Sequence, residues 1–378
     1  MNLFGENKSD FDNRLVLAFL SSKINLNPAR VQQILSIYPT LETAICDNFG
    51  LLKNNKLKWL EKWSTVNLKL ETEKFQAKLD QNKVQIVTSL CADYPATLRV
   101  LDDFPVVLYY QGNLKLVQNS QMLTVVGSRN FGKYAELLLK QILNPVCQMG
   151  IGVVSGLAFG TDAASHEIAL SKNAPTIGVI GSGLDDKSFY PKANLGLKNL
   201  LLNSTRNSEQ NGLVLSEYAP GVSANVFTFP QRNRLLAALT DLTWVVEAGL
   251  KSGSLITALK ARDLGKTVAT TPGSVLEENL DGNLKLLKDG ANIISCSEDI
   301  FTLLGLKQFP QIIPKETIQF GSVEEAKIYQ ILSLSPQETV LLSQKVQMAI
   351  SELGTHLTML EISGLAVNLG ENNWIRGG

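Results

Sequence analysis

The sequence predicts an α/β protein: an extended Rossmann-like, doubly wound and mostly parallel sheet, preceded by a small all-helical domain and followed by a winged-helix-like domain. Two observations support this prediction. Between residues 120 and 300, short Val, Ile and Leu runs alternate with helical stretches of the length expected between parallel strands. The runs are apolar throughout, which is typical of parallel strands covered on both faces.

The first part of the chain, 1–80, is predicted to form a helical domain of the SAM or helix-hairpin-helix kind. Short amphipathic helices are expected at 14–22, 28–38, 40–50 and 51–63. A Rossmann-like domain is predicted over 81–310. It includes a leading connector with a strand at Val106–Tyr110 that closes on Gly112-Asn113.

The Rossmann-like domain is expected to contain a regular succession of strands and helices. The predicted strands are 122–128, 151–156, 176–183, 213–217, 242–247, 266–273 and 291–295. The predicted helices are 133–150, 162–172, 193–204, 232–240, 254–265 and 282–290. This region is longer than a minimal dinucleotide-binding fold.

The last segment, 311–378, is predicted to be a linker and a winged-helix-like domain. Helices are expected at 323–335, 339–347 and 348–364, followed by a two-stranded tip at 365–377. The segment holds four Lys and Arg against seven Asp and Glu. The excess of negative charge repels DNA phosphates and so disfavours tight DNA binding. A partner-binding or regulatory role suits this charge better.

The amino-acid composition argues against several kinds of protein. The 378 residues are 44% hydrophobic with a formal net charge of +0, so any nucleic-acid contact must come from a local patch. The four Cys and two His stand far apart in the sequence, which argues against a disulfide framework, a metal site or a bound cofactor. Because there is no apolar run long enough to cross a bilayer and no apolar leader, we expect a cytoplasmic protein without membrane contact.

Candidate site residues follow the predicted strands, because ligands of such sheets bind beyond the carboxyl ends. Small residues there let backbone N–H groups face an anion, as at Gly127-Ser128 and at Ser155-Gly156. Arg129 leaves the end of the first parallel strand. Its guanidinium is expected either to bind phosphate or to hold the loop through an ion pair.

Two further segments carry positive charge. Arg232 and Arg234 stand near a helix start on either side of Asn233, where they would meet an anion or pair with a carboxylate such as Glu217 or Asp241. The loop of Lys187, Tyr190 and Lys192 interleaves positive charge with an aromatic ring, which suits single strands.

The sequence contains little evidence of a catalytic motif. The sequence has no nucleophile elbow, no P-loop lysine motif and no H-E-x-x-H. His166 lies within a predicted helix without an evident nucleophile, so a structural role is expected for it.

Seven ordered blocks between 120 and 300 resemble the DNA-processing protein A (DprA/Smf) family. They are "VVGSR", "SGLAFGTDAASHEIAL", "GSGLDDKSFYPKAN", "LSEYAPG", "FPQRNRLLAALT", "VVEAGLKSGSLITALKARDLGKTVATTPG" and "DGNLKLLKDGANII". The family's usual G-I-D is Gly160-Thr161-Asp162 here, and its I-I-A-G-L-S is Leu235 to Thr240.

The resemblance implies a non-enzymatic protein that binds single-stranded DNA, protects it and loads a RecA-type recombinase in natural transformation. It also implies a homodimer formed through the Rossmann-like domain. By motif, the implied DNA-binding residues are Gly127, Ser128, Arg129, Gly156, Lys187, Tyr190, Lys192, Asn194, Arg232, Asn233 and Arg234.

Two other functions stay open. The sheet resembles more distantly the nucleotide phosphoribohydrolases of the LOG type, which suggests an enzyme using the same cleft. In that alignment Thr257 falls on the catalytic glutamate, and a threonine cannot supply a carboxylate. A transcription regulator acting through the winged helix is the third hypothesis, and the acidic tail opposes it.

Overall fold

The computed structural model describes residues 13–24, 26–39, 43–44, 47, 68–119, 121–207, 209–306, 320–333 and 335–377. The chain divides into two compact units, Met1–Lys307 and Gln308–Gly378. The domain boundaries at 80 and 310 stay predictions. No helix within the described ranges has the length and apolar character needed to span a membrane.

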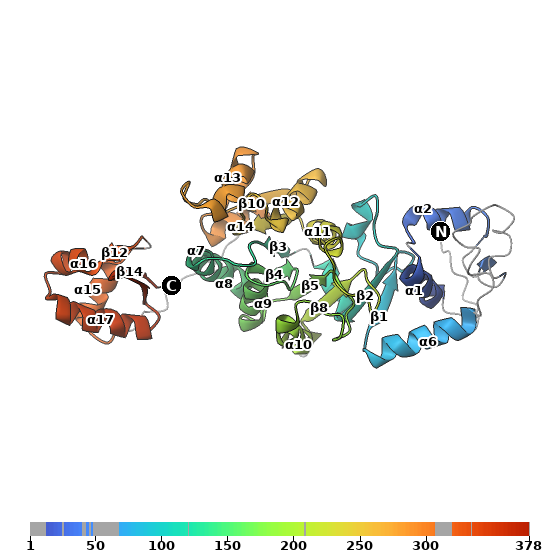
Figure 1. Ribbon diagram of the computed structural model, residues 1–378, viewed down its shortest axis with the longest axis horizontal. Coiled ribbons are helices and arrows are strands. Elements are labelled where there is room, and N and C mark those ends of the chain that lie inside the picture. Colours follow the sequence, from blue (N-terminus) through green and yellow to red (C-terminus); the bar gives the residue numbers. More distant parts are fainter. Residues whose placement is uncertain are drawn as a thin grey trace. The chain divides into compact units, whose positions relative to one another are not determined.

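A large sheet forms the centre of the first unit (Figure 1). Among the described residues its strand order is β1-β2-β8-β5-β4-β3-β9-β10-β11. From β8 to β11 all neighbours are parallel, and each predicted apolar run contributes a strand. These strands are β3 (Met122–Val126), β4 (Gly152–Ser155), β5 (Thr176–Ile180), β8 (Gly212–Ser216), β9 (Leu242–Val245), β10 (Thr267–Thr270) and β11 (Asn292–Ile293). The mostly parallel Rossmann-like fold is therefore confirmed.

Helices cover both faces of the sheet, which explains why its central strands are apolar throughout. One face carries α7 (Lys133–Leu138), η4 (Leu139–Leu143), α8 (Asn144–Gln148), α9 (Thr161–Ser171), α10 (Leu195–Asn203) and α14 (Ser297–Leu303). The other carries α11 (Thr228–Leu239) and α12 (Gly253–Asp263). The helix α13 (Asp281–Lys288) follows β10. The helix expected at 232–240 begins four residues earlier, at Thr228.

Two antiparallel strands extend the sheet beyond β8. The predicted connector strand is β2 (Val107–Gly112), and its partner β1 (Gln85–Thr88) was not predicted. A four-residue strand that begins with a polar residue gives little periodicity to detect. Short elements complete this region: η2 (Ala96–Val100), η3 (Leu114–Gln118), η5 (Lys192–Asn194), η6 (Glu278–Leu280), β6 (Thr205–Arg206) and β7 (Glu209–Gln210).

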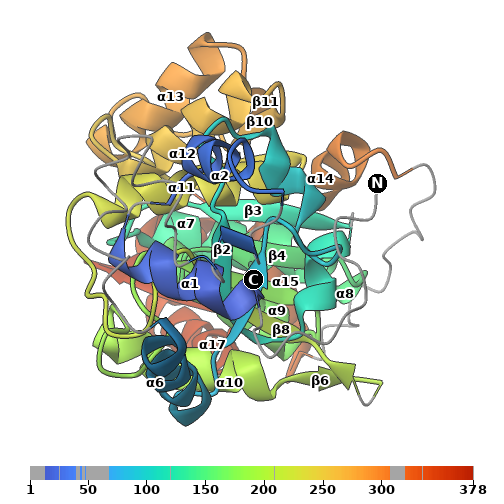
Figure 2. The same ribbon diagram turned by 90° about the vertical axis from the view of Figure 1, so that its right-hand side faces the viewer.

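Of the described N-terminal helices, α1 packs against this antiparallel extension and α6 packs against α1 (Figure 2). They are α1 (Asn13–Lys23), α2 (Pro28–Leu35) and α6 (Leu68–Gln81). Phe19 and Phe75 join one apolar cluster with Tyr109 of β2, whose hydroxyl donates to the Ala18 carbonyl at 2.9 Å. The helices expected at 40–50 and 51–63 lie almost wholly outside the described residues.

The second unit has the winged-helix order that the sequence predicted. Its helices are α15 (Val323–Ile331), α16 (Thr339–Val346) and α17 (Ile350–Ile362), and the tip is β13 (Ala366–Gly370) and β14 (Asn373–Arg376). A short strand, β12 (Gln337–Glu338), adds a third member to this sheet. Its core contains Leu342, Leu357 and Trp374.

Candidate functional site

A cleft opens where the strand order of the parallel sheet reverses. β3 lies between β4 and β9, which the chain reaches over opposite faces of the sheet. In open α/β sheets this is the place where ligands bind. The cleft has a volume of about 540 Å³. Most of its lining comes from three segments: the turn after β3 at 126–130, the first part of α11 at 229–236 and the turn into α12 at 249–257. Ala158, Asp162 and Asn279 complete it.

The turn after β3 is fixed against the start of α9. The Thr161 amide donates to the Ser128 carbonyl at 3.1 Å, and the Thr161 hydroxyl donates to it at 3.2 Å. A Cβ on Gly127 would lie 2.5 Å from that hydroxyl, and a Cβ on Gly160, at φ +71°, would lie 2.4 Å from the Ser128 carbonyl oxygen. Glycine is therefore required at both places for this close approach. These contacts hold Arg129 at the rim of the cleft.

Arg129 is exposed, and its guanidinium lies over the Phe229 ring at 5.0 Å from the centroid. The Phe229 ring in turn packs against Tyr190, with ring centroids 5.7 Å apart. Within the described residues no carboxylate forms an ion pair with Arg129, so the loop-holding alternative is not observed. Arg129, Phe229 and Tyr190 form a row, which we call the rim row, with an exposed cation, a half-buried Phe229 ring and an exposed Tyr190 ring.

Arg232 is buried below the cleft. Its guanidinium donates to the Gly156 carbonyl at 2.8 Å and to the Val179 carbonyl, and its Nε donates to Asn233. Burial lowers the pKa of Arg232, and the neighbouring Asp162 carboxylate opposes that shift. A Cβ on Gly156 would lie only 2.1 Å from the guanidinium. Gly156 thus makes room for a buried arginine, which lines the cleft while its donors are used by partners inside the protein.

Arg234 is held by carboxylates. Its Nη2 lies 2.8 Å from a Glu217 oxygen, and its Nε lies 3.1 Å from an oxygen of Asp103. Of the two partners that the sequence suggested, Glu217 is the one observed, whereas Asp241 lies 3.7 Å from Lys266 instead. The positive charge of Arg234 is therefore already neutralised inside the protein.

Asn233 supports the glycine and serine turn that leads into α12. Its amide nitrogen donates to the Gly253 carbonyl at 3.1 Å. Ser252 caps the helix by accepting from the Ser254 amide, and nothing lies within 4 Å of the position that a Cβ on Gly253 would take. The first turn of α12 is consequently open to an anion. The exposed Lys251 stands beside it on the lining of the cleft.

The loop 184–194 brings the remaining candidates to the same edge of the sheet. The Asn194 amide donates to the Leu157 and Ala158 carbonyls at 3.0 and 2.9 Å, which fastens the loop to the turn after β4. Lys192 donates to the Lys187 carbonyl at 2.9 Å. Tyr190 is 43% exposed, so its ring is half available for stacking.

Phe229 and Lys251 are parts of the site that were not predicted from the sequence, whereas Thr257 was named only as the residue at the position of a catalytic glutamate. The signal for Phe229 is weak: two aromatic residues precede the predicted helix 232–240, in "VFTFP", and the observed helix already begins at Thr228. Thr257 is 1% exposed and lines the cleft, where the enzyme hypothesis requires a carboxylate. The buried Asp162 also lines the cleft, but it accepts from the Gly156 and Ala158 amides and lies near Arg232.

His166 has a structural environment, as expected. Its side chain is fully buried, and Nδ1 lies 2.7 Å from the Thr176 hydroxyl. Burial, reinforced by the positive charge of Arg232, lowers the pKa of His166 to about 3. The imidazole is therefore neutral at physiological pH and lies outside the cleft lining.

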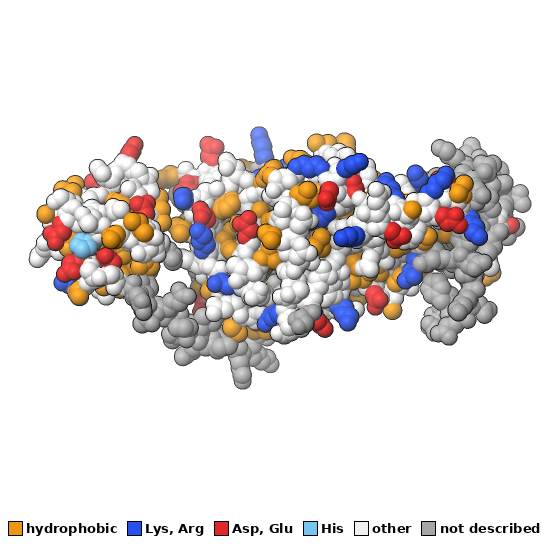
Figure 3. All heavy atoms as spheres, turned by 90° about the horizontal axis from the view of Figure 1, so that it is seen from below, with side chains coloured by type: hydrophobic (Ala, Val, Ile, Leu, Met, Phe, Trp, Pro, Cys, Tyr) orange, Lys and Arg blue, Asp and Glu red, His pale blue; other side chains and the backbone are white. Residues whose placement is uncertain are grey.

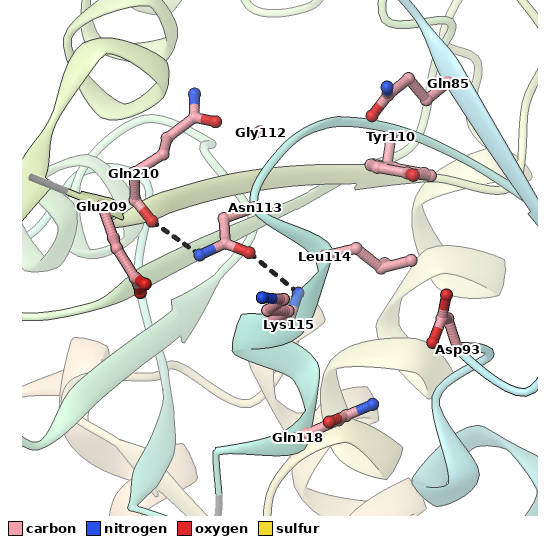
Figure 4. Close-up of a pocket in the computed structure, with 10 residues that line it drawn as sticks. All are labelled: Gln85, Asp93, Tyr110, Gly112, Asn113, Leu114, Lys115, Gln118, Glu209 and Gln210. Atoms are coloured by element: carbon pink, nitrogen blue, oxygen red, sulfur yellow. Dashed lines mark hydrogen bonds between the residues drawn. The ribbon is translucent and has the colours of Figure 1, made fainter.

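Another pocket, of about 480 Å³, lies where β8 begins, at the opposite edge of the sheet (Figure 4). Asn113 shapes it by donating to the Gln210 carbonyl at 2.8 Å and accepting from the Lys115 amide at 3.1 Å. Its charged lining residues are Lys115, Asp93 and Glu209, one ammonium against two carboxylates. This charge does not favour a polyanion.

The comparisons with known proteins agree with this geometry. A family model described as DNA recombination-mediator protein A matches residues 85–305, which is more than half of the chain. The chain belongs to this family. The resemblance to the DprA/Smf proteins is thereby confirmed, and the match spans the sheet, the cleft and the rim row.

Members of the DNA recombination-mediator protein A family include characterised relatives. DNA processing protein DprA of Streptococcus pneumoniae is 40% identical over 207 residues, 55% of this chain and 70% of the relative. The X-ray structure of DprA from Streptococcus pneumoniae aligns with a TM-score of 0.56 at 32% identity, covering 72% of this chain and 96% of that chain. The structure of DNA processing protein A from Helicobacter pylori, reported for its single-stranded DNA binding mode, aligns with a TM-score of 0.51 at 29% identity, covering 59% and 95%.

Proposed function

We propose that this chain binds single-stranded DNA at the carboxyl edge of its sheet. The observation that carries the proposal is the rim row: the Arg129 guanidinium, the Phe229 ring and the exposed Tyr190 ring stand side by side at the cleft. Stacking on rings needs unpaired bases, whereas a cation without an internal carboxylate partner suits the phosphates between them.

The surrounding charges support the same ligand. Lys187, Lys192 and Lys251 are exposed near the rim row, and no ion pair with a carboxylate is observed for them within the described ranges. Figure 3 shows both signs of charge scattered over one face of the chain, as the balanced composition predicts. A ligand that needs local rather than global positive charge fits this distribution. The related Helicobacter pylori protein is described by its single-stranded DNA binding mode.

Three further properties belong to this proposal: the chain is not an enzyme, it loads a RecA-type recombinase in the cytoplasm, and it forms a homodimer through the Rossmann-like domain. Val275 and Leu276 are 76% and 89% exposed on a loop of that domain, as suits a self-association surface. Light scattering tests the dimer. Recombinase filament assembly on single strands, with and without the chain, tests the loading.

The decisive experiment is a mobility-shift titration against single-stranded and duplex oligonucleotides of equal length, at low and moderate salt. The proposal expects clear preference for the single strand with little dependence on sequence, because stacking and phosphate contacts are sequence-tolerant. Weak and equal binding to both forms would overturn it. Release of free base from nucleoside monophosphates would instead support the phosphoribohydrolase hypothesis.

A further inference from the structure

A second groove runs between α6 and α10, away from the cleft. Both helices lie on the lower side of the sheet in Figures 1 and 2. The groove has a volume of about 990 Å³. It reaches from the loop 184–188 at the carboxyl ends of the strands to Gly112 and Gln210 at the start of β8, with residues of α6 on one wall and residues of α10 on the other.

Three exposed lysines line this groove, and no carboxylate pairs with them within the described residues: Lys78, Lys83 and Lys187. Lys78 is held in place because its ammonium donates to the Pro220 carbonyl at 2.6 Å. A Cβ on Gly221, at φ +94°, would lie 2.6 Å from that nitrogen, so the glycine leaves room for it. A neutral carbonyl fixes the position of the charge without cancelling it.

The acidic residues of the groove are already engaged. Asp186 lies 3.3 Å from the ammonium of Lys198, which is buried in the groove wall. Asp185 accepts from the Gly221 amide at 2.6 Å and from the Ser188 amide at 3.1 Å. The four lysines and two aspartates of the lining leave two positive charges in excess, on a chain whose net charge is +0. The groove is thus locally positive and suits a polyanion.

The remaining lining residues indicate which part of a polyanion would lie here. They are amides, two serines, glycines and leucines, and the lining contains no aromatic side chain. Bases therefore have no ring to stack on in this groove, whereas phosphates have ammonium groups and amide donors. Lys187 lines the groove and is three residues from Tyr190 of the rim row on the same loop. One loop thus contributes a residue both to the groove and to the rim row.

We propose that the groove between α6 and α10 is a second nucleic-acid contact, in which the sugar-phosphate backbone of the strand leaving the rim row binds to Lys187, Lys78 and Lys83. This inference rests on the proposed single-strand binding at the cleft. It assigns a role to the N-terminal helical region, because α6 supplies one wall. Binding there is independent of base identity and extends the length of strand that one chain covers.

The test compares affinities for oligothymidylates of about 6 and about 20 nucleotides, which bracket a short and an extended site. The double variant Lys78→Gln and Lys83→Gln should bind the short strand like the wild type and lose affinity for the long one. Each lost phosphate contact lowers the slope of log affinity against log salt by about 0.7, so the double variant should lose about 1.4 on the long strand. Abasic sites in the outer part of the long strand should leave its affinity unchanged.

Lys69→Gln is the matched control, because this exposed lysine lies on α6 outside the groove lining. The single variant Lys83→Gln serves as a second test in case loss of the Lys78 contact disturbs folding. No contact of the Lys83 ammonium is observed in the described structure, so this change should leave the fold intact. Equal affinity of wild type and Lys83→Gln for the long strand would overturn the groove. Absence of wild-type binding to either strand would instead overturn the proposed function, and with it this inference.

Discussion

Replacing Arg129 with Ala separates binding from stability more cleanly than any other change at the cleft. The side chain is exposed, pairs with no carboxylate among the described residues and contacts the Phe229 ring at 5.0 Å. An exposed cation–π contact contributes about 0.5–1 kcal/mol, so the free energy of unfolding should fall by no more than that. A hydrogen bond to a charged group contributes about 1.5–3 kcal/mol. Loss of one phosphate contact should therefore weaken single-strand binding about 10- to 150-fold.

The assay is fluorescence anisotropy with a labelled single strand over a range of salt, paired with urea unfolding of the same samples. Arg129→Lys is the companion variant, because it keeps the charge but not the planar fork. It should retain the salt slope of the wild type and bind more weakly, whereas Arg129→Ala should reduce the slope by about 0.7. Affinity of Arg129→Ala within about twofold of wild type, with unchanged unfolding, would refute the rim row as the binding site.

Three other predictions concern the support of the site. Asp162→Asn should lower the free energy of unfolding by about 1–3 kcal/mol, measured in urea, because the buried Arg232 loses the attraction of a neighbouring carboxylate; an unchanged midpoint would contradict this. Gly160→Ala should weaken both folding and DNA binding, because the added Cβ would lie 2.4 Å from the Ser128 carbonyl oxygen that helps to position Arg129. Burial raises the pKa of Glu247, so ionisation of this carboxyl opposes folding. The contribution of Glu247 to stability is fully present below the unfolded-state pKa of about 4.5 and is lost as pH rises through its folded-state pKa. Glu247→Gln should remove that loss, and identical pH dependence of unfolding in both proteins would exclude it.

The positive residues near the cleft divide into two groups that the sequence could not distinguish. In "FPQRNR" the two arginines stand at equivalent distances from Asn233 and were both expected to meet an anion or a carboxylate. The structure buries both, with 5% and 7% exposure, and uses their donors for internal partners. A DNA-binding role for Arg232 and Arg234 is consequently indirect: they hold the strand ends and the adjacent loops in position. The Arg129 side chain remains available to a ligand because the turn that carries it lies at the surface.

The neutral composition of the chain has a consequence for how it would bind a polyanion. With 35 positive and 35 negative side chains, long-range attraction is weak, and salt screens what remains beyond about 10 Å. Binding must then depend on short-range contacts at places where the carboxylates are already engaged. The cleft and the groove between α6 and α10 both have that property, since Asp162 accepts from the Gly156 and Ala158 amides and Asp186 pairs with Lys198.

The parallel sheet, the helices that cover it and the family can all be predicted from the residues in order. Continuous apolar runs separated by helical stretches leave few alternatives, because each run must be buried on both faces. It also placed Arg129, Lys187, Tyr190 and Lys192 at strand ends that share one edge of a sheet. These conclusions depend on local pattern and on strand polarity, which are properties of neighbouring residues along the chain.

Which charged side chains lack an internal partner depends on how the chain packs. Arg234 meets Glu217 and Asp103 from segments far away in the sequence, and Phe229 meets Arg129 across 100 positions. The groove between α6 and α10 likewise needs two helices more than 100 residues apart to lie side by side. Ion pairing and ring stacking act over a few ångströms. They therefore depend on distances between side chains that packing sets, and these distances cannot be read from the positions of the residues in the sequence.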